Sequence, residues 1–213
     1  MIEGLDVDVI FPKLTPREPA RSRHDAAARR LDFLRACWGT LGPTQREHLT
    51  THCQAVSTMA FRLCVAMRLP ATAVQRAGLA GLFHDIGKCA IPEALLAKCG
   101  PLTATERRII NQHAVLGARY TLAITGDAGL ARIVALHHHW EAAAGRTGED
   151  SLTLQAAIVQ AADALVSMTS DRPYARARTR AEALAELTRG AGEQFDGRVV
   201  RAANLLDVWG EAA

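Results

Sequence analysis

The sequence predicts an all-α fold: a helical bundle of about seven to nine helices, preceded by a short N-terminal arm. From about Asp25 onward, apolar residues recur at the spacing that places them on one face of a helix. Proline and glycine interrupt this pattern at intervals that suit short connections between helices. Aromatic residues make up only 5% of the chain and hydrophobic residues 49%, so alanine must fill much of the core. That composition favours closely packed helices.

Residues 1–24 are predicted to form an arm and linker. A short β-like run from Val7 to Phe11 is followed by prolines at positions 12, 16 and 19. Residues 25–213 are predicted to form one domain. A chain of 213 residues is long enough for one well-filled core, and its composition demands no second one.

The charge and the amino terminus limit the classes of partner. A net charge of +3 is too small to indicate a nucleic-acid partner, but it is compatible with a small anionic substrate. The segment from Met1 to Asp6 carries acids where a signal peptide needs a basic start and an apolar stretch. No uninterrupted apolar run of about 18 residues occurs. We therefore expect a cytoplasmic protein with neither a nucleic-acid nor a membrane partner.

The cysteines are odd in number and contain no closely spaced pair of the zinc-finger kind. We expect reduced, packed thiols that do not bind metal. The five positions are Cys37, Cys53, Cys64, Cys89 and Cys99.

A helix start is predicted at Thr103. Thr103 followed three residues later by Glu106 has the pattern of a capping box, and the apolar pair Ile109 and Ile110 comes directly after it. We expect this helix to continue through His113.

His84 and Asp85 offer the first chemical signal. An imidazole next to a carboxylate supplies nitrogen and oxygen donors within one helical turn, which suits a borderline metal better than magnesium or calcium. A His-Asp pair is common by chance, so this signal needs support from other donors.

Further candidate ligands come from separate segments. His48 and His52 are four residues apart in a predicted helix, so their side chains lie on one face, either as metal ligands or as solvated histidines. Asp163 interrupts an apolar stretch, where a buried carboxylate is costly unless a cation or metal pairs with it. His113 has apolar neighbours and is either a ligand or a core histidine. The triple from His137 to His139 ends another apolar segment.

The chain resembles an HD-GYP domain, a branch of the HD metal-dependent phosphohydrolases. The resemblance covers residues 44–206 and depends on an ordered series of motifs. They are His52, His84-Asp85-Ile86-Gly87-Lys88, Ile91-Pro92, Leu95-Leu96, Lys98, Leu102-Thr103, Glu106, His113, Gly117, the histidine pair near 137, Ala162-Asp163, Thr169 to Tyr174, Glu182-Ala183 and Phe195-Asp196.

This resemblance implies an HD-superfamily helical bundle that hydrolyses cyclic di-GMP, to pGpG or GMP, with water activated by two or three metal ions. Iron or manganese is the usual metal. The implied ligands are His52, His84, Asp85, His113, two of the three histidines 137–139, and Asp163, with Asp85 as the bridging carboxylate. Lys88, also a catalytic candidate, would bind substrate and stabilise the developing phosphoryl charge. A protein partner in cyclic di-GMP signalling is also implied.

The chain departs from the family in its substrate loop. With His137 and His138 as the ligand pair, the segment Gly145-Arg146-Thr147 stands where the family has Gly-Tyr-Pro. The alternative pair, His138 and His139, loses even the matching glycine. Two residues are candidate substrate-phosphate contacts, Arg172 and Arg176, although Ala175 stands where a basic residue is common. His48 occupies the position of a glutamate ligand in trinuclear members, where it also can bind metal.

Three functions are compatible with these motifs. The first is a cyclic di-GMP phosphodiesterase. The second is a degenerate HD-GYP signalling module that binds a nucleotide or a protein without hydrolysis, as the altered loop would allow. The third is an HD phosphohydrolase that acts on another phosphate ester.

Overall fold

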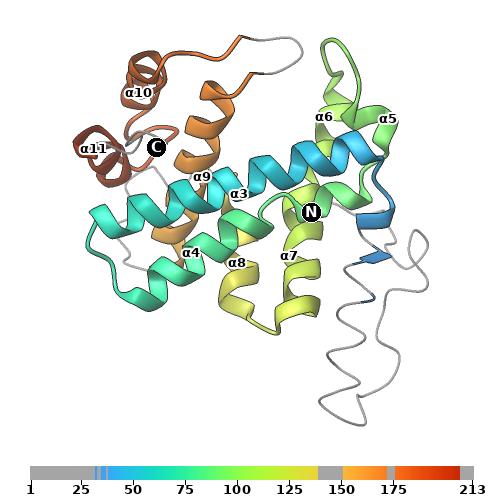
Figure 1. Ribbon diagram of the computed structural model, residues 1–213, viewed down its shortest axis with the longest axis horizontal. Coiled ribbons are helices and arrows are strands. Elements are labelled where there is room, and N and C mark those ends of the chain that lie inside the picture. The colour runs from blue at the N-terminus through green and yellow to red at the C-terminus, as the bar shows by residue number, and fades with distance from the viewer. Residues whose placement is uncertain (1–31, 33–34, 37, 139–150, 172–175, 207–213) are drawn as a thin grey trace.

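The described part of the chain is a bundle of α-helices without a β-strand (Figure 1). The computed structural model describes residues 32, 35–36, 38–138, 151–171 and 176–206. Its elements are α3 (Pro43–Ala66), α4 (Ala71–Phe83), the 3-10 helix η1 (Ile86–Ala90), α5 (Glu93–Leu96), α6 (Ala104–Asn111), α7 (His113–Thr125), α8 (Ala128–Leu136), α9 (Ser151–Thr169), α10 (Arg180–Arg189) and α11 (Gly197–Leu205). This confirms the all-α fold. The arm predicted for residues 1–24 lies outside the described residues.

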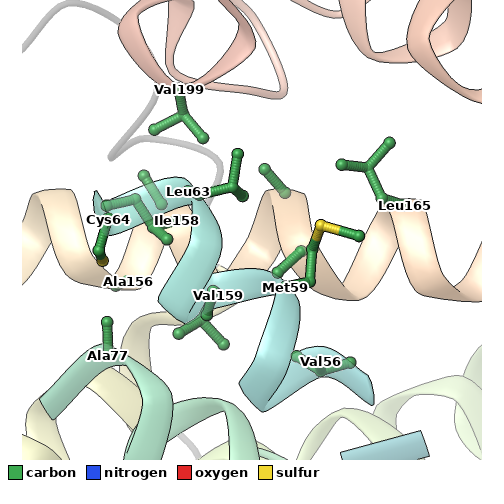
Figure 2. Close-up of a cluster of buried hydrophobic side chains, with 14 of the residues drawn as sticks. Val56, Met59, Leu63, Cys64, Ala77, Ala156, Ile158, Val159, Leu165 and Val199 are labelled. Carbon is green, nitrogen blue, oxygen red and sulfur yellow. The ribbon is translucent and has the colours of Figure 1, made fainter. Parts of the chain in front are cut away.

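The main core lies where α3 and α9 pack together, with α4, α8, α10 and α11 around them (Figures 1 and 2). Val56 and Leu63 from α3 and Ile158 and Val159 from α9 are fully buried. Burying each such side chain stabilises the fold by about 1.5–3 kcal/mol. By length and composition α9 is apolar enough to cross a membrane. Its apolar residues instead supply this core.

Small residues let α3 and α4 approach closely. A Cβ on Gly81 would lie 2.8 Å from the Cα of Ser57, and the Ser57 hydroxyl donates to the Gly78 carbonyl at 2.7 Å. Ala77 and Ala80, on the same face of α4, are fully buried. The expectation that alanine fills the core of closely packed helices is therefore confirmed.

The chain leaves α4 through His84 and Asp85 and enters η1, which lies against α7. Gly87 permits this contact: a Cβ there would collide with the carbonyl of His113 and lie 2.5 Å from the amide nitrogen of Gly117. A second, smaller apolar cluster joins the α3, η1 and α7 regions. It consists of Leu41, Leu49, Cys53, Ile86, Cys89 and Tyr120.

One predicted helix boundary is wrong. The capping box at Thr103 is confirmed, since its hydroxyl accepts the Glu106 amide at 3.2 Å while Glu106 accepts the Thr103 amide at 2.8 Å. However, α6 ends at Asn111, and His113 is the first residue of α7. Gln112 keeps helical dihedral angles at the break, so the apolar pattern continues across it. The break between α6 and α7 lies where α7 packs against η1. A contact of this kind between separate elements is not visible in the local sequence.

The prediction that the cysteine thiols are packed in the interior is confirmed for three described cysteines and wrong for one. Cys53, Cys64 and Cys89 are buried, as predicted, but Cys99 is exposed in the loop after α5. Cys37 lies outside the described residues.

Candidate metal centre

Three buried histidines share one hydrogen-bonding arrangement. Each imidazole donates from Nδ1 to the backbone carbonyl three residues earlier, in the last turn of α4, α6 or α8, where carbonyls lack a partner within the helix. The pairs are His84 to Gly81 at 2.8 Å, His113 to Ile110 at 2.7 Å and His137 to Val134 at 2.6 Å. With the proton held on Nδ1, the Nε2 lone pair is available to a metal. The same helix ends carry partial negative charge, which favours a cation.

The Nε2 atoms of one set converge on a single point. Those of His113 and His137 are 3.4 Å apart, and those of His138 and His113 are 3.2 Å apart. His113 and His137 present lone pairs to each other and cannot form a hydrogen bond in this tautomer. Two nitrogens on one metal, each at about 2.0–2.1 Å, are separated by roughly this distance. His113, His137 and His138, here called the His113 group, thus fit a metal ion.

A second set lies beside it. His52, His84 and Asp85 form the His52 group, whose donor atoms lie within 4.8 Å of one another. The Nε2 of His84 is buried without a hydrogen-bond partner among the described residues, and the nearest oxygen of Asp85 is 3.3 Å away. A buried nitrogen without a partner is costly, so this position also fits a metal ion. Nε2 of His52 faces Asp163 at 3.1 Å.

Asp85 joins the two groups. Its Oδ1 lies 3.3 Å from Nε2 of His113, while its Oδ2 lies 3.3 Å from Nε2 of His84. One carboxylate oxygen therefore faces each group. This is the position of a carboxylate that bridges two metals.

The electrostatics keep most of these groups in the form that binds metal. Burial opposes ionisation of Asp85, but Lys88, His84 and His113 outweigh it and hold the carboxyl pKa well below its usual value. Burial lowers the pKa of His113 to about 4 and that of His137 well below its usual value, so both imidazoles are neutral at pH 7. His84 differs, because Asp85 overcomes burial and raises its pKa. A cation at this site would take the place of that proton.

Lys88 is placed next to the bridging carboxylate. Its Nζ lies 2.5 Å from Oδ2 of Asp85. Burial alone would lower the pKa of Lys88, but Asp85 raises it, so the side chain stays charged. Lys88 also lines a cavity of 370 Å³ that opens onto the centre. The other lining residues are Leu41, Gln45, His48, Leu49, Thr51, His52, Ala55, Asp85, Leu96, Val166, Ser170 and Asp171.

The remaining predicted site residues are placed differently. Asp163 projects from α9 to His52, and its own Oδ1 accepts a hydrogen bond from Ser167 at 3.0 Å. His48 is exposed and lines the cavity, but it belongs to neither donor group. Arg176 is exposed and is not among the cavity residues. Arg172 and His139 lie outside the described residues, as does the segment 145–147.

Sequence reasoning missed several residues around the centre. It did not anticipate the three Nδ1 hydrogen bonds to backbone carbonyls, because helix ends near a histidine carry no distinctive sequence. It also missed Ser167, although the spacing of four residues from Asp163 on one helix was an available signal. The sequence also does not distinguish Gln45 and Thr51 as cavity residues.

Comparison with known proteins decides the family. Residues 43–199 match the sequence pattern described as the HD domain. The chain belongs to the HD domain family. The match covers the histidines and Asp85 of the two donor groups and the cavity residues from Gln45 to Asp171.

Related HD proteins confirm the HD-GYP type. A cyclic di-GMP phosphodiesterase of Pseudomonas aeruginosa is 37% identical over 165 residues, 75% of this chain and 39% of that protein. A cyclic di-GMP phosphodiesterase of Thermotoga maritima is 31% identical over 156 residues, 71% of this chain and 42% of that protein. A 3'3'-cGAMP-specific phosphodiesterase of Vibrio cholerae is 24% identical over 214 residues, 96% of this chain and 46% of that protein. The chain spans less than half the length of these relatives.

A solved structure supports the fold of this HD domain. The HD domain of the L. monocytogenes phosphodiesterase PgpH, in complex with cyclic-di-AMP, superposes with a TM-score of 0.55 at 15% identity. The likeness covers 85% of this chain and 99% of that one.

Proposed function

We propose that this HD domain is a metal-dependent phosphodiesterase that hydrolyses cyclic di-GMP. The observation that carries the proposal is the position of Asp85 between two groups of metal donors, beside a cavity that a substrate can enter. The names of the relatives support the choice of a cyclic dinucleotide as substrate.

The chain's own residues would hold the metals and orient the substrate. The His113 group would hold one ion, the His52 group with Asp163 the other, and Asp85 would bind both. When bound, such a pair supplies an activated water and stabilises the attacking and leaving oxygens of a phosphodiester. The burial of Asp85, His84 and His137 keeps bulk water from competing for their donor atoms.

Lys88 would act on the phosphate itself. Its ammonium is at the cavity wall next to Asp85, where a phosphodiester oxygen would lie. A fixed cation at this place stabilises charge that develops on phosphoryl oxygens during the reaction.

Iron or manganese is our proposal for the metals, in a cytoplasmic protein. A mixed set of imidazoles and carboxylates suits these ions, whereas magnesium and calcium prefer oxygen ligands alone. A site that holds iron(II) needs a reducing compartment, in agreement with the free thiols of the described cysteines.

The test is direct. Protein prepared anaerobically and loaded with iron(II) or manganese(II) should convert cyclic di-GMP to linear pGpG or GMP, as measured by chromatography. Asp85→Asn should abolish this turnover, because an amide cannot bridge two metals as a carboxylate does. Absence of turnover in fully metal-loaded protein would contradict the proposal. Calorimetric binding without turnover would then favour the non-hydrolysing signalling module.

A second candidate substrate is a different cyclic dinucleotide. The cGAMP-specific phosphodiesterases among the relatives favour it, since they show that similar chains can act on a mixed dinucleotide. A panel of cyclic di-GMP, 3'3'-cGAMP and cyclic di-AMP under the same conditions separates these alternatives.

A further inference from the structure

The cavity beside the metal centre is lined by both apolar and polar side chains. Apolar side chains of Leu41, Leu49 and Leu96 contribute to its wall. The two residues that follow α9 contribute two polar side chains, Ser170 and Asp171. The helices α9 and α3 pack against each other (Figure 1). Ser170 and Asp171 therefore line the same cavity as His52 and Asp85.

Asp171 has acceptor capacity to spare in this cavity. Its Oδ1 accepts one hydrogen bond, from the amide of Ala177 at 3.0 Å. A carboxylate has about four lone-pair positions, so the rest of Oδ1 and all of Oδ2 remain for a ligand. No hydrogen bond or ion pair to Oδ2 occurs among the described residues. Asp171 is exposed, so a ligand in the cavity can reach it.

The hydroxyl of Ser170 does not offer a competing donor. It donates to the carbonyl of Val166 at 2.8 Å, which leaves only its lone pairs for a ligand. Both polar groups at this end of the cavity therefore present acceptors. A ligand that suits them must present two or more donors side by side.

We propose that Asp171 selects guanine in the substrate by accepting hydrogen bonds from N1–H and the N2 amino group of one base. This inference rests on the proposed function, because it places one phosphate of the same cyclic dinucleotide at Lys88 and the metals. The Watson–Crick edge of guanine presents those two donors next to each other, whereas adenine presents an acceptor at N1. A carboxylate that faces the adenine N1 lone pair gains one hydrogen bond at most and is repelled by that lone pair.

The geometry predicts which dinucleotides are accepted. One Asp171 reads one base, so 3'3'-cGAMP should bind as well as cyclic di-GMP by presenting its guanine, and cyclic di-AMP should bind about ten- to a hundredfold more weakly. Cyclic di-IMP, which lacks the N2 amino group, should lie between them.

Asp171→Asn is the decisive variant. Asparagine keeps an oxygen for the Ala177 amide, so the loop contact and the melting temperature should be unchanged. It replaces Oδ2 by an NH2 donor, which faces the N2 amino group of guanine as donor against donor and can donate to N1 of adenine. The variant should lose the preference for cyclic di-GMP and move toward cyclic di-AMP, as measured by kcat/KM and by calorimetric Kd on the metal-loaded protein.

The controls separate this inference from the proposed function. Turnover of bis(p-nitrophenyl) phosphate, which has no base, measures the activity of the metal centre separately from base recognition. The protein could hydrolyse none of the dinucleotides and still bind cyclic di-GMP more tightly than cyclic di-AMP. That result would contradict the proposed function and support the selection of guanine by Asp171. Equal Kd values for cyclic di-GMP and cyclic di-AMP in the wild type would overturn the base selection. An unchanged preference for cyclic di-GMP in Asp171→Asn would overturn it as well.

Discussion

Nε2 of His113 and Nε2 of His137 lie 3.4 Å apart, although both imidazoles carry their proton on Nδ1 and offer each other only a lone pair. Two acceptors at this distance repel each other unless a cation lies between them. The contact therefore assigns the His113 group to a metal more directly than the presence of histidines alone.

The two donor groups should bind metal separately. The wild-type protein should bind two ions per chain, one for each donor group, and His113→Ala should bind one. The lost ion is that of the His113 group, because the His52 group keeps all of its own donors. Elemental analysis of protein loaded under anaerobic conditions measures both counts. An unchanged metal content in His113→Ala would contradict the assignment.

His48 should not change that count. It is exposed and belongs to neither donor group, so His48→Ala should retain the metal content of the wild type. The same elemental analysis tests this. A loss of one ion in this variant would instead identify His48 as a metal ligand.

Lys88 should affect the reaction and leave the metals in place. Lys88→Met replaces the methylenes of the side chain by an unbranched apolar chain and removes the terminal ammonium with its charge, so kcat should fall by about 10²–10³-fold with metal content unchanged. Lys88→Arg should recover part of the rate. Kinetics and elemental analysis on the same preparations distinguish this role from a structural one, in which all variants would lose metal.

Gly87 should be necessary for the centre. Gly87→Ala places a methyl group against the carbonyl of His113 and 2.5 Å from the Gly117 amide, which the backbone relieves only by separating η1 from α7. We expect a loss of about 1–3 kcal/mol in the free energy of unfolding. The metal content should fall as well, since Asp85 moves away from His113. Chemical denaturation and elemental analysis measure the two effects.

Gly78 provides the matched control. It lies in the same helix–turn region of the chain, but a Cβ there has no atom nearer than the Ser57 hydroxyl at 3.8 Å. Gly78→Ala should bind metal normally and be slightly more stable, because alanine favours a helix interior. Equal damage in both variants would refute the argument from close backbone contact.

The ion pair of Glu106 with Lys98 should make stability depend on pH. Hydrogen bonds from Lys98 and Thr103 lower the pKa of Glu106 from 4.5 to about 2. A lowered pKa in the folded state gives stability that is complete above pH 4.5 and is lost as the pH falls through about 2. Glu106→Gln keeps the capping box and removes the charge, so its melting temperature should be lower than wild type at pH 7.

The difference between the two melting temperatures should shrink as the pH falls below 4.5. Thermal denaturation followed by circular dichroism at a series of pH values provides the measurement. A difference that does not depend on pH would attribute the effect to packing and not to the ion pair.

Local sequence patterns were sufficient to predict the helical fold of this protein and one of its helix starts. Helical periodicity predicted the bundle, and the Thr103–Glu106 pattern predicted its capping box, because both depend on residues within a turn or two of each other. The donors His52, His84, Asp85 and His113 were recognised as candidates by residue type and order.

Tertiary structure decided how those candidates combine. The sequence could not separate the His113 group from the His52 group, nor show that His48, one turn before His52, belongs to neither. It also predicted a helix through His113, where the chain instead starts α7. These features depend on which helix ends meet in space, and that is set by packing between distant segments such as Gly87 against α7. A periodic pattern indicates which face of a helix is buried, but only the packing of the bundle determines which lone pairs face each other.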